Sequence, residues 1–165
     1  MFGWAAAMVA AVLGADGRSA CAAELFRLER STNANVVLYE VNAAPAGALD
    51  PAEPLRPVWL MLAEDGRREE LTGLERSFAY GVELRRATAD VAVVALKAEP
   101  RRAVSIRSHH GCFVAMVAID GREALLRTIF VEVGGGLFPA VRSVELVGSD
   151  PETGEELRET LAVRR

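Results

Sequence analysis

The sequence predicts an all-β fold, an antiparallel β-sandwich or partly closed barrel with one short helix. Segments rich in β-branched residues recur about every ten positions, which is typical of strands in sandwiches and barrels. Amphipathic segments of roughly 10–15 residues do not alternate with them, which argues against a doubly wound α/β fold. The chain has 165 residues, 51% hydrophobic and 25% charged, enough for one domain with its own core.

Ten segments are predicted as strands because they combine β-branched and aromatic residues between turn-forming residues. They are Leu25–Arg30, Asn35–Asn42, Val58–Ala63, Val82–Arg86, Val91–Lys97, Ala103–Ser108, Cys112–Ile119, Glu123–Val133, Ser143–Gly148 and Glu156–Val163. Three of them are apolar on both faces: Val58–Ala63, Val91–Leu96 and Cys112–Ile119. Such strands need cover on both sides, from the helix and loops, from a second copy in a homodimer, or from a ligand in a cavity.

Turn residues separate the predicted strands. Asp120-Gly121 predicts a two-residue hairpin, in which both central positions need positive φ, and Asp65-Gly66 predicts another. The segment from Asp150 to Gly154 suits a longer hairpin, because proline fixes φ early and glycine takes the left-handed exit. Ala43–Pro57 holds four of the seven prolines and is predicted to be a loop.

The one predicted helix covers Gly73–Tyr80. Thr72 and Glu75 have the spacing of a capping box, in which each side chain binds a backbone N–H at the helix start. Gly81 is expected to close the helix at its C-terminus. Three apolar residues are expected on one side of this helix, against one end or face of the sheet: Leu71, Leu74 and Phe78.

The N-terminal residues predict export. Trp4–Leu13 is an unbroken apolar run, too short to cross about 30 Å of hydrocarbon as a helix. Ala20-Cys21-Ala22 follows, with the small-x-small pattern that signal peptidases accept. We therefore predict a signal peptide over residues 1–22 and a single β-rich domain over residues 23–165, periplasmic or secreted.

Cleavage after Ala22 removes Cys21 and leaves Cys112 as the lone cysteine. An intramolecular disulfide is then excluded, and stability is expected to come from the core. Two alternatives remain for the N-terminal segment. It is a short buried helix, or Cys21 is a lipid-attachment site, which would require a Leu-like residue where Arg18 stands.

Composition narrows the classes of partner. The chain has 19 basic and 23 acidic side chains, a formal net charge of −4, so nothing favours binding to a nucleic acid. No motif in the sequence calls for a cofactor. The expected partner is an unidentified small molecule or an envelope protein, and the mature chain is expected to have no transmembrane span.

Four motifs together resemble a known family, the bacterial family catalogued as domain of unknown function 4833. They are R-S-x-N-x-N-V-x-x-Y-x-x-N at residues 30–42, W-x-M-L-x-E-D-G at 59–66, E-R-x-F-A-Y-G at 75–81, and V-E-L-x-G-x-D-x-x-T-G at 144–154. The resemblance spans residues 25–165. It implies export in bacteria and implies no activity.

Six residues form a candidate ligand-binding set: Asn33, Asn35, Tyr39, Trp59, Glu75 and Tyr80. Asn33 and Asn35, together with Asn42, bracket an apolar strand and could form a polar patch with Tyr39 and Trp59. The favoured alternative is turn chemistry, in which each Asn side chain binds nearby backbone. Glu75 could act as a general base, but the predicted capping box already gives it a structural role.

His110 and Cys112 are the candidate metal ligands. Residues i and i+2 share a face of an extended chain, so both could reach one ion, or pair as imidazolium and thiolate. Zinc needs three or four ligands, so Asp or Glu would have to complete the site. The favoured alternative is a polar hairpin tip, with Cys112 starting a buried strand as a small hydrophobic residue.

The sequence therefore predicts an exported, non-catalytic domain that binds a ligand or associates with the envelope. One alternative is a binder of a small apolar ligand, with four residues as cavity walls: Tyr39, Trp59, Phe113 and Met116. Another is a metal- or cysteine-dependent hydrolase centred on His110 and Cys112.

Overall fold

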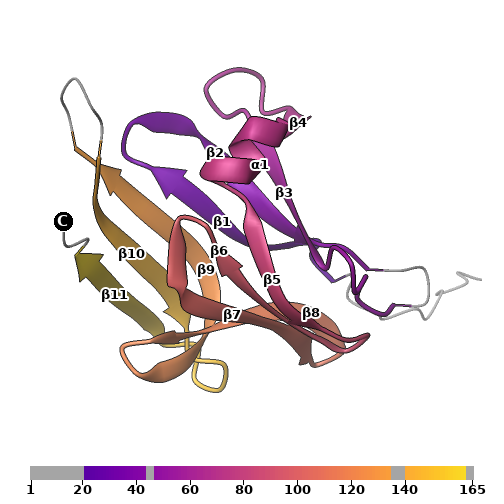
Figure 1. Cartoon of the computed structure of the whole chain (residues 1–165). Coiled ribbons are helices and arrows are strands. Elements are labelled where there is room, and N and C mark those ends of the chain that lie inside the picture. The colour runs from indigo at the N-terminus through magenta and orange to yellow at the C-terminus, as the bar shows by residue number, and fades with distance from the viewer. Residues whose placement is uncertain (1–20, 44–46, 135–139, 163–165) are drawn as a thin grey trace, which may run out of the picture.

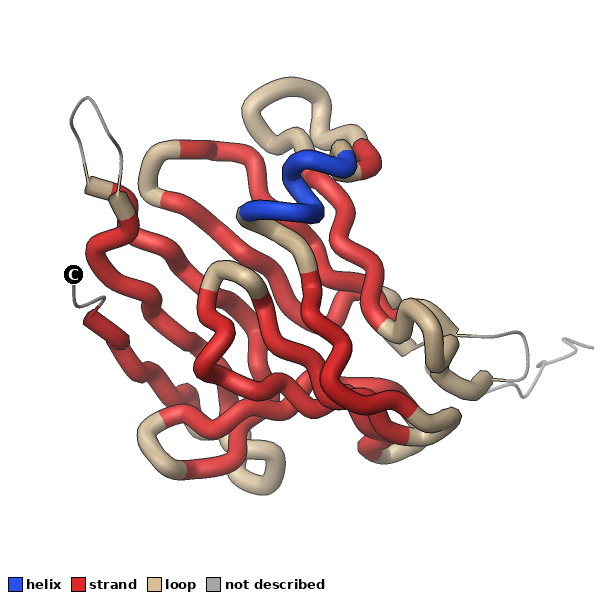
Figure 2. Tube along the Cα trace, viewed as in Figure 1, coloured by secondary structure: helices blue, strands red, loops and turns tan. Residues whose placement is uncertain are grey.

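The computed structural model describes residues 21–43, 47–134 and 140–162. The all-β prediction is confirmed: in these ranges eleven strands form one curled sheet, a half-barrel, and a short helix covers one end (Figure 1). Figure 2 shows how far strands dominate over helix. No helix in the described ranges is long and apolar enough to cross a membrane. Most of the predicted signal peptide lies outside the described residues.

The sheet runs in the order β4-β3-β2-β1-β9-β8-β7-β6-β5, and β10 and β11 extend it from the other edge of β9. The bounds are β1 (Glu24–Arg30), β2 (Asn33–Val41), β3 (Leu55–Leu60), β4 (Arg68–Glu70), α1 (Gly73–Phe78), β5 (Val82–Ala87), β6 (Val91–Leu96), β7 (Glu99–His109), β8 (Cys112–Ile119), β9 (Arg122–Val133), β10 (Val141–Ser149) and β11 (Glu156–Ala162).

Strand β9 organises the sheet. Residues 122–125 of β9 pair with β8, residues 128–131 pair with β1, and β10 occupies the opposite edge. Two groups of strands, β1–β4 and β5–β8, therefore diverge from one long strand and curl toward each other. The pairing of β1 with β9 is parallel, which corrects the expectation of a purely antiparallel sheet.

The core fills the inside of the half-barrel. Phe26 and Tyr39, both almost fully buried, stack with their ring centroids 4.6 Å apart. Facing them are buried residues of the other strand group, including Val94 and Ile106. Aromatic pairs in this geometry add to the free energy gained from buried apolar area. Side chains of both strand groups therefore pack together inside the half-barrel.

A second apolar cluster explains why the segment that includes β3 is apolar on both faces. Val36, Leu38 and Val58 are buried together, with Leu60 packed against them, apart from the main core. Alternate residues of β2 and β3 point to opposite faces, so both faces of this strand pair carry apolar side chains.

All ten predicted strands are present, and nine of them have shifted ends, whereas the bounds of Cys112–Ile119 are as predicted. The eleventh, β4, was missed because its three residues, Arg-Glu-Glu, carry no apolar signal. Strand β3 begins at Leu55, so Pro57 lies in a strand and not in the predicted loop. The predicted end of the last strand, Val163, lies outside the described residues.

The turn predictions had mixed outcomes. Asp120 (φ 51°) and Gly121 (φ 78°) confirm the two-residue hairpin. Gly154 (φ 73°) confirms the left-handed exit of the longer hairpin. The prediction for Asp65-Gly66 was wrong. Only Gly66 of the two has positive φ, and a bond from Met61 N to Arg67 O, 2.9 Å long, closes a wider loop.

The helix starts as predicted and ends two residues early, at Phe78. Leu71 is buried in the core, whereas Leu74 is 70% exposed, so the expected position of Leu74 was wrong. Gly81 does not take a left-handed conformation. Instead, a Cβ at Gly81 would lie 1.7 Å from the Arg76 carbonyl oxygen, so glycine is required for close approach to the helix.

Candidate functional site

A pocket of about 290 Å³ lies beside the first turn of α1. Its lining comes from four elements: the starts of β2 and α1, the end of β3 and strand β4. Its lining residues are Asn33, Asn35, Trp59, Met61, Glu69, Glu70, Thr72 and Glu75. Four of the six predicted ligand-binding residues are in this set. Residues that the sequence places in separate motifs therefore meet at one surface.

Glu75 links the helix to the sheet. Its Oε2 accepts from the Thr72 backbone N–H and hydroxyl, both at 2.8 Å, which confirms the capping box. Its Oε1 accepts from the Trp59 indole Nε1 at 3.2 Å. These donors, the Thr72 backbone N–H first, lower the pKa of Glu75 below its ordinary value. Such a carboxylate is a weak base, so the geometry favours positioning over proton abstraction.

Tyr80 and Tyr39 lie behind the pocket and support it. The Tyr80 ring meets the Trp59 ring edge-on, with centroids 4.9 Å apart. Tyr39 donates its hydroxyl to the Tyr80 carbonyl oxygen at 3.1 Å. Burial, followed by the nearby Tyr80, raises the pKa of Tyr39 well above its ordinary value, so Tyr39 stays protonated. Neither tyrosine lines the pocket: Tyr80 packs directly against Trp59, and Tyr39 contributes through its bond to Tyr80.

Arg30, at the end of β1, completes this support. Its Nη1 donates to the Tyr80 hydroxyl at 2.9 Å, and its guanidinium carbon lies 5.1 Å from the centroid of the Tyr80 ring. Its Nε is buried and has no acceptor among the described residues.

The side-chain oxygens of Asn33 and Asn35 both accept hydrogen bonds from backbone N–H groups. Asn33 Oδ1 accepts from the Asn35 backbone N–H, and Asn35 Oδ1 accepts from the Ala63 N–H, both at 2.9 Å. Turn chemistry therefore accounts for the Asn33 oxygen, whereas the Asn35 oxygen ties β2 to the loop after β3. Each amide also carries an NH2 group, which remains a donor for a ligand in the pocket.

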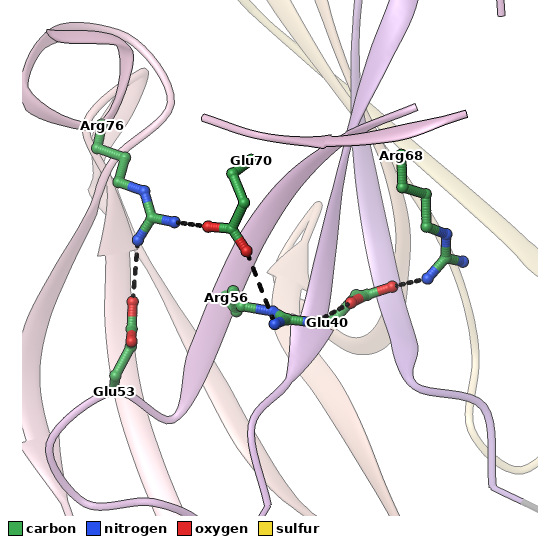
Figure 3. A network of polar contacts seen from close by, with 6 residues as sticks. All are labelled: Glu40, Glu53, Arg56, Arg68, Glu70 and Arg76. Atoms are coloured by element: carbon green, nitrogen blue, oxygen red, sulfur yellow. Dashed lines mark hydrogen bonds and ion pairs between the residues drawn. The ribbon is translucent and has the colours of Figure 1, made fainter. Parts of the chain in front are cut away.

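A chain of ion pairs joins α1 to the outer side of β2, and Figure 3 draws its members: Glu40, Glu53, Arg56, Arg68, Glu70 and Arg76. The carboxylate of Glu40, which is only 4% exposed, forms ion pairs with Arg56, at 3.1 Å, and with Arg68 of β4. Arg76 of α1 binds Glu70 at 2.8 Å and Glu53 at 3.2 Å. A buried carboxylate needs such partners, and they hold β4 and the helix against the sheet.

Two of the three acidic side chains that line the pocket form ion pairs with arginines, and the third, Glu75, is hydrogen-bonded to Thr72 and Trp59. Glu70 has Arg76, and Glu69 accepts from Arg67 at 2.7 Å. No group of three or more potential metal ligands occurs among the described residues. The pocket thus offers hydrogen-bond acceptors, amide donors and an indole without a concentrated negative charge.

The predicted pair His110 and Cys112 is arranged differently from a metal site. Cys112 is disulfide-bonded to Cys21, with Cα atoms 5.4 Å apart, so the expectation that no intramolecular disulfide forms was wrong. A sulfur in a disulfide is neither a thiolate nucleophile nor a metal ligand. His110 (φ 50°) and Gly111 (φ 81°) form the two-residue tip of the β7–β8 hairpin, as in the favoured alternative.

The four predicted walls of an apolar cavity do not share one pocket. Trp59 borders the pocket beside α1, whereas Phe113 borders a groove of about 280 Å³ between β1 and β8. Tyr39 is in the core. Met116 alternates along β8 with the core residues Ala115 and Val117, and therefore points to the opposite face.

Sequence reasoning missed half of the pocket lining: Met61, Glu69, Glu70 and Thr72. Met61 is part of the tryptophan motif and could have been included from that motif. Thr72 was recognised only as a helix cap. The two glutamates had no signal, because β4 was not predicted.

Most of the chain matches one known protein family. The family described as domain of unknown function (DUF4833) matches residues 26–160. This range includes all four motifs and every described strand, except for the first two residues of β1 and the last two of β11. No curated protein matches the chain, and no solved structure does.

Proposed function

The chain belongs to the DUF4833 family, a family defined by a domain of unknown function, and on that premise we propose that it is an exported, non-catalytic binding domain. Its ligand is a small polar molecule rich in hydroxyl groups, of the saccharide class, and its binding site is the pocket beside α1. The observation that carries the proposal is that Asn33, Asn35, Trp59 and Glu75 line one pocket.

The chemistry of the lining supports this ligand class. The amides of Asn33 and Asn35 supply donors, and the carboxylates of Glu69 and Glu70 supply acceptors. A hydroxyl group both donates and accepts, so it suits a lining of mixed character. The half-buried Trp59 ring adds an apolar surface for the C–H groups of a sugar. Because both carboxylates have arginine partners, a cation gains little here.

The bonding state of the reactive groups supports a role in binding and not in catalysis. Glu75 has both carboxylate oxygens occupied and a lowered pKa, which makes it a weak general base. The sulfur of Cys112 is bonded to Cys21. Export is supported by that disulfide, because such bonds persist in oxidising compartments, and by the apolar run Trp4–Leu13.

Trp59 gives a direct assay. The sequence has two tryptophans, so a Trp4→Phe variant of the full chain leaves Trp59 as the single indole. Its emission is titrated with glucose, with N-acetylglucosamine and with the β-1,4-linked disaccharide of the latter. We expect a saturable change with at least one sugar, because the indole lines the pocket and binds Glu75.

Matched variants identify the site. Asn33→Ala removes a pocket amide and is expected to weaken binding about tenfold or more, since a ligand hydrogen bond is lost. Asn42→Ala removes the same side chain beyond the other end of β2 and should leave binding unchanged. Saturation by palmitate without any response to sugars would contradict the proposal and favour an apolar ligand.

A further inference from the structure

The two strand groups of the half-barrel diverge where β1 and β8 leave the same edge of β9. The β8 partners are residues 122–125 of β9, and the β1 partners are residues 128–131. No ladder joins β1 to β8 in the described part of the chain. The two groups therefore share β9 and the core, but lack direct backbone pairing at this end.

The disulfide lies at this divergence. Cys21 stands three residues before β1, and Cys112 is the first residue of β8. The segment between Cys21 and β1 is further fixed by a bond from Val41 N to Ala23 O, 2.8 Å long. Cys21 is exposed, so its side chain packs little and its contribution to the fold comes through the covalent bond.

We propose that processing leaves Cys21 in the mature protein, and that an oxidising compartment then joins it to Cys112. This inference rests on the proposed export. Signal peptidase would cut upstream of Cys21, and not after Ala22, because a cut after Ala22 removes one sulfur of the bond.

The oxidation step balances as a thiol–disulfide exchange. Cys21 and Cys112 each lose the hydrogen of their thiol, one S–S bond forms, and two electrons pass to the disulfide of a protein oxidant, which leaves as a dithiol. The same bond excludes a lipid on Cys21, because a thioether would occupy the sulfur. The structure thus separates three fates of Cys21: removal, lipidation and cross-linking.

The cross-link is expected to stabilise the domain strongly. The two cysteines are 91 residues apart in sequence, so the bond closes a long loop in the unfolded chain and removes much of its conformational entropy. The loop includes β1 to β7, that is, one whole strand group and most of the other. Reduction should therefore release β1 and β8 from each other at the end where no ladder in the described ranges holds them.

The test uses the full chain with its own leader, isolated from the cell envelope. Its intact mass is measured after treatment with N-ethylmaleimide, with and without prior reduction. We expect a chain that begins upstream of Cys21, takes up no maleimide before reduction and takes up two after it. A chain that begins at Ala23, or two thiols that react before reduction, would overturn the inference.

Variants measure the contribution of the bond. Cys21→Ser should lower the melting temperature of the oxidised protein by on the order of 10 °C, because Cys21 is exposed and loses only the cross-link. Reduced wild-type protein should melt at the temperature of this variant. The double variant with Cys112→Ser should melt close to the single one, since the two sulfurs act as a unit. Equal melting of oxidised wild type and Cys21→Ser would contradict the inference.

The test of the disulfide and the test of the proposed ligand site can fail independently of each other. The Trp59 titration reads the pocket beside α1, whose lining includes neither cysteine. A protein that binds sugars but begins at Ala23 would retain its binding function and refute the cross-link. A cross-linked protein that binds no sugar would refute the proposed ligand and leave the inference about Cys21 intact.

Discussion

The two ends of the half-barrel are held together in contrasting ways. At the helix end, many weak contacts converge: the capping box of Thr72 and Glu75, the Trp59 indole and the ion pairs of Arg76. At the other end, one covalent bond joins segments that are 91 residues apart. The helix end positions polar side chains around a pocket, and the disulfide end supplies a fixed frame. The comparison shows that local contacts set the geometry of the helix end, where we propose that the ligand binds, whereas the other end depends on a covalent cross-link.

At the helix end, Gly81 cannot be replaced by a residue with a side chain without a steric clash. A methyl group there would lie 1.7 Å from the Arg76 carbonyl oxygen, which belongs to backbone and cannot swing away. Gly81→Ala should therefore reduce the free energy of unfolding by about 3 kcal/mol, measured by urea denaturation.

Gly73→Ala is the matched control for Gly81→Ala. Gly73 is the first residue of α1, and a methyl group added there would meet nothing within 4 Å. Alanine at this position should therefore cost nothing and add some helix propensity. If the two variants were equally stable, the close approach of Gly81 to the helix would not be a determinant of this end.

Removal of the helix cap at Thr72 should destabilise the protein less than Gly81→Ala does, and by an amount that depends on pH. Thr72→Ala should lower the free energy of unfolding by about 1 kcal/mol at neutral pH, and Thr72→Ser should recover most of it. The folded-state pKa of Glu75 is lowered, so its contribution is present above the ordinary pKa of a glutamate and is lost as the pH falls through the folded value. The deficit of Thr72→Ala should therefore shrink in acid, and a deficit that grows in acid would contradict the assignment.

Much of the fold could be predicted because its determinants are local. Cys112–Ile119 was predicted with both ends correct, because the apolar run is bounded by Gly111 and by the Asp120-Gly121 turn. The helix start followed from the Thr72 and Glu75 spacing alone. Leu74 was misplaced because helical periodicity identifies an apolar side only over several turns, and α1 is six residues long.

The remaining features depend on contacts that sequence spacing does not encode. The parallel pairing of β1 with β9 joins residues about a hundred positions apart, and β4 forms only because β3 offers it a free edge. The disulfide was excluded by an assumption about cleavage and not by any property of the two cysteines. Half of the residues that line the pocket were predicted. Asn33, Trp59 and Glu75 belong to recognisable motifs, whereas Glu69 and Glu70 do not.

The most direct test of the central claim, that the pocket beside α1 holds a polar ligand, is native mass spectrometry of the protein isolated from its own envelope fraction. The account predicts a small molecule that stays with the wild-type protein, is released on denaturation and is absent from Asn33→Ala, while Asn42→Ala retains it. A wild-type spectrum showing the polypeptide alone, or an adduct that both variants retain equally, would contradict it.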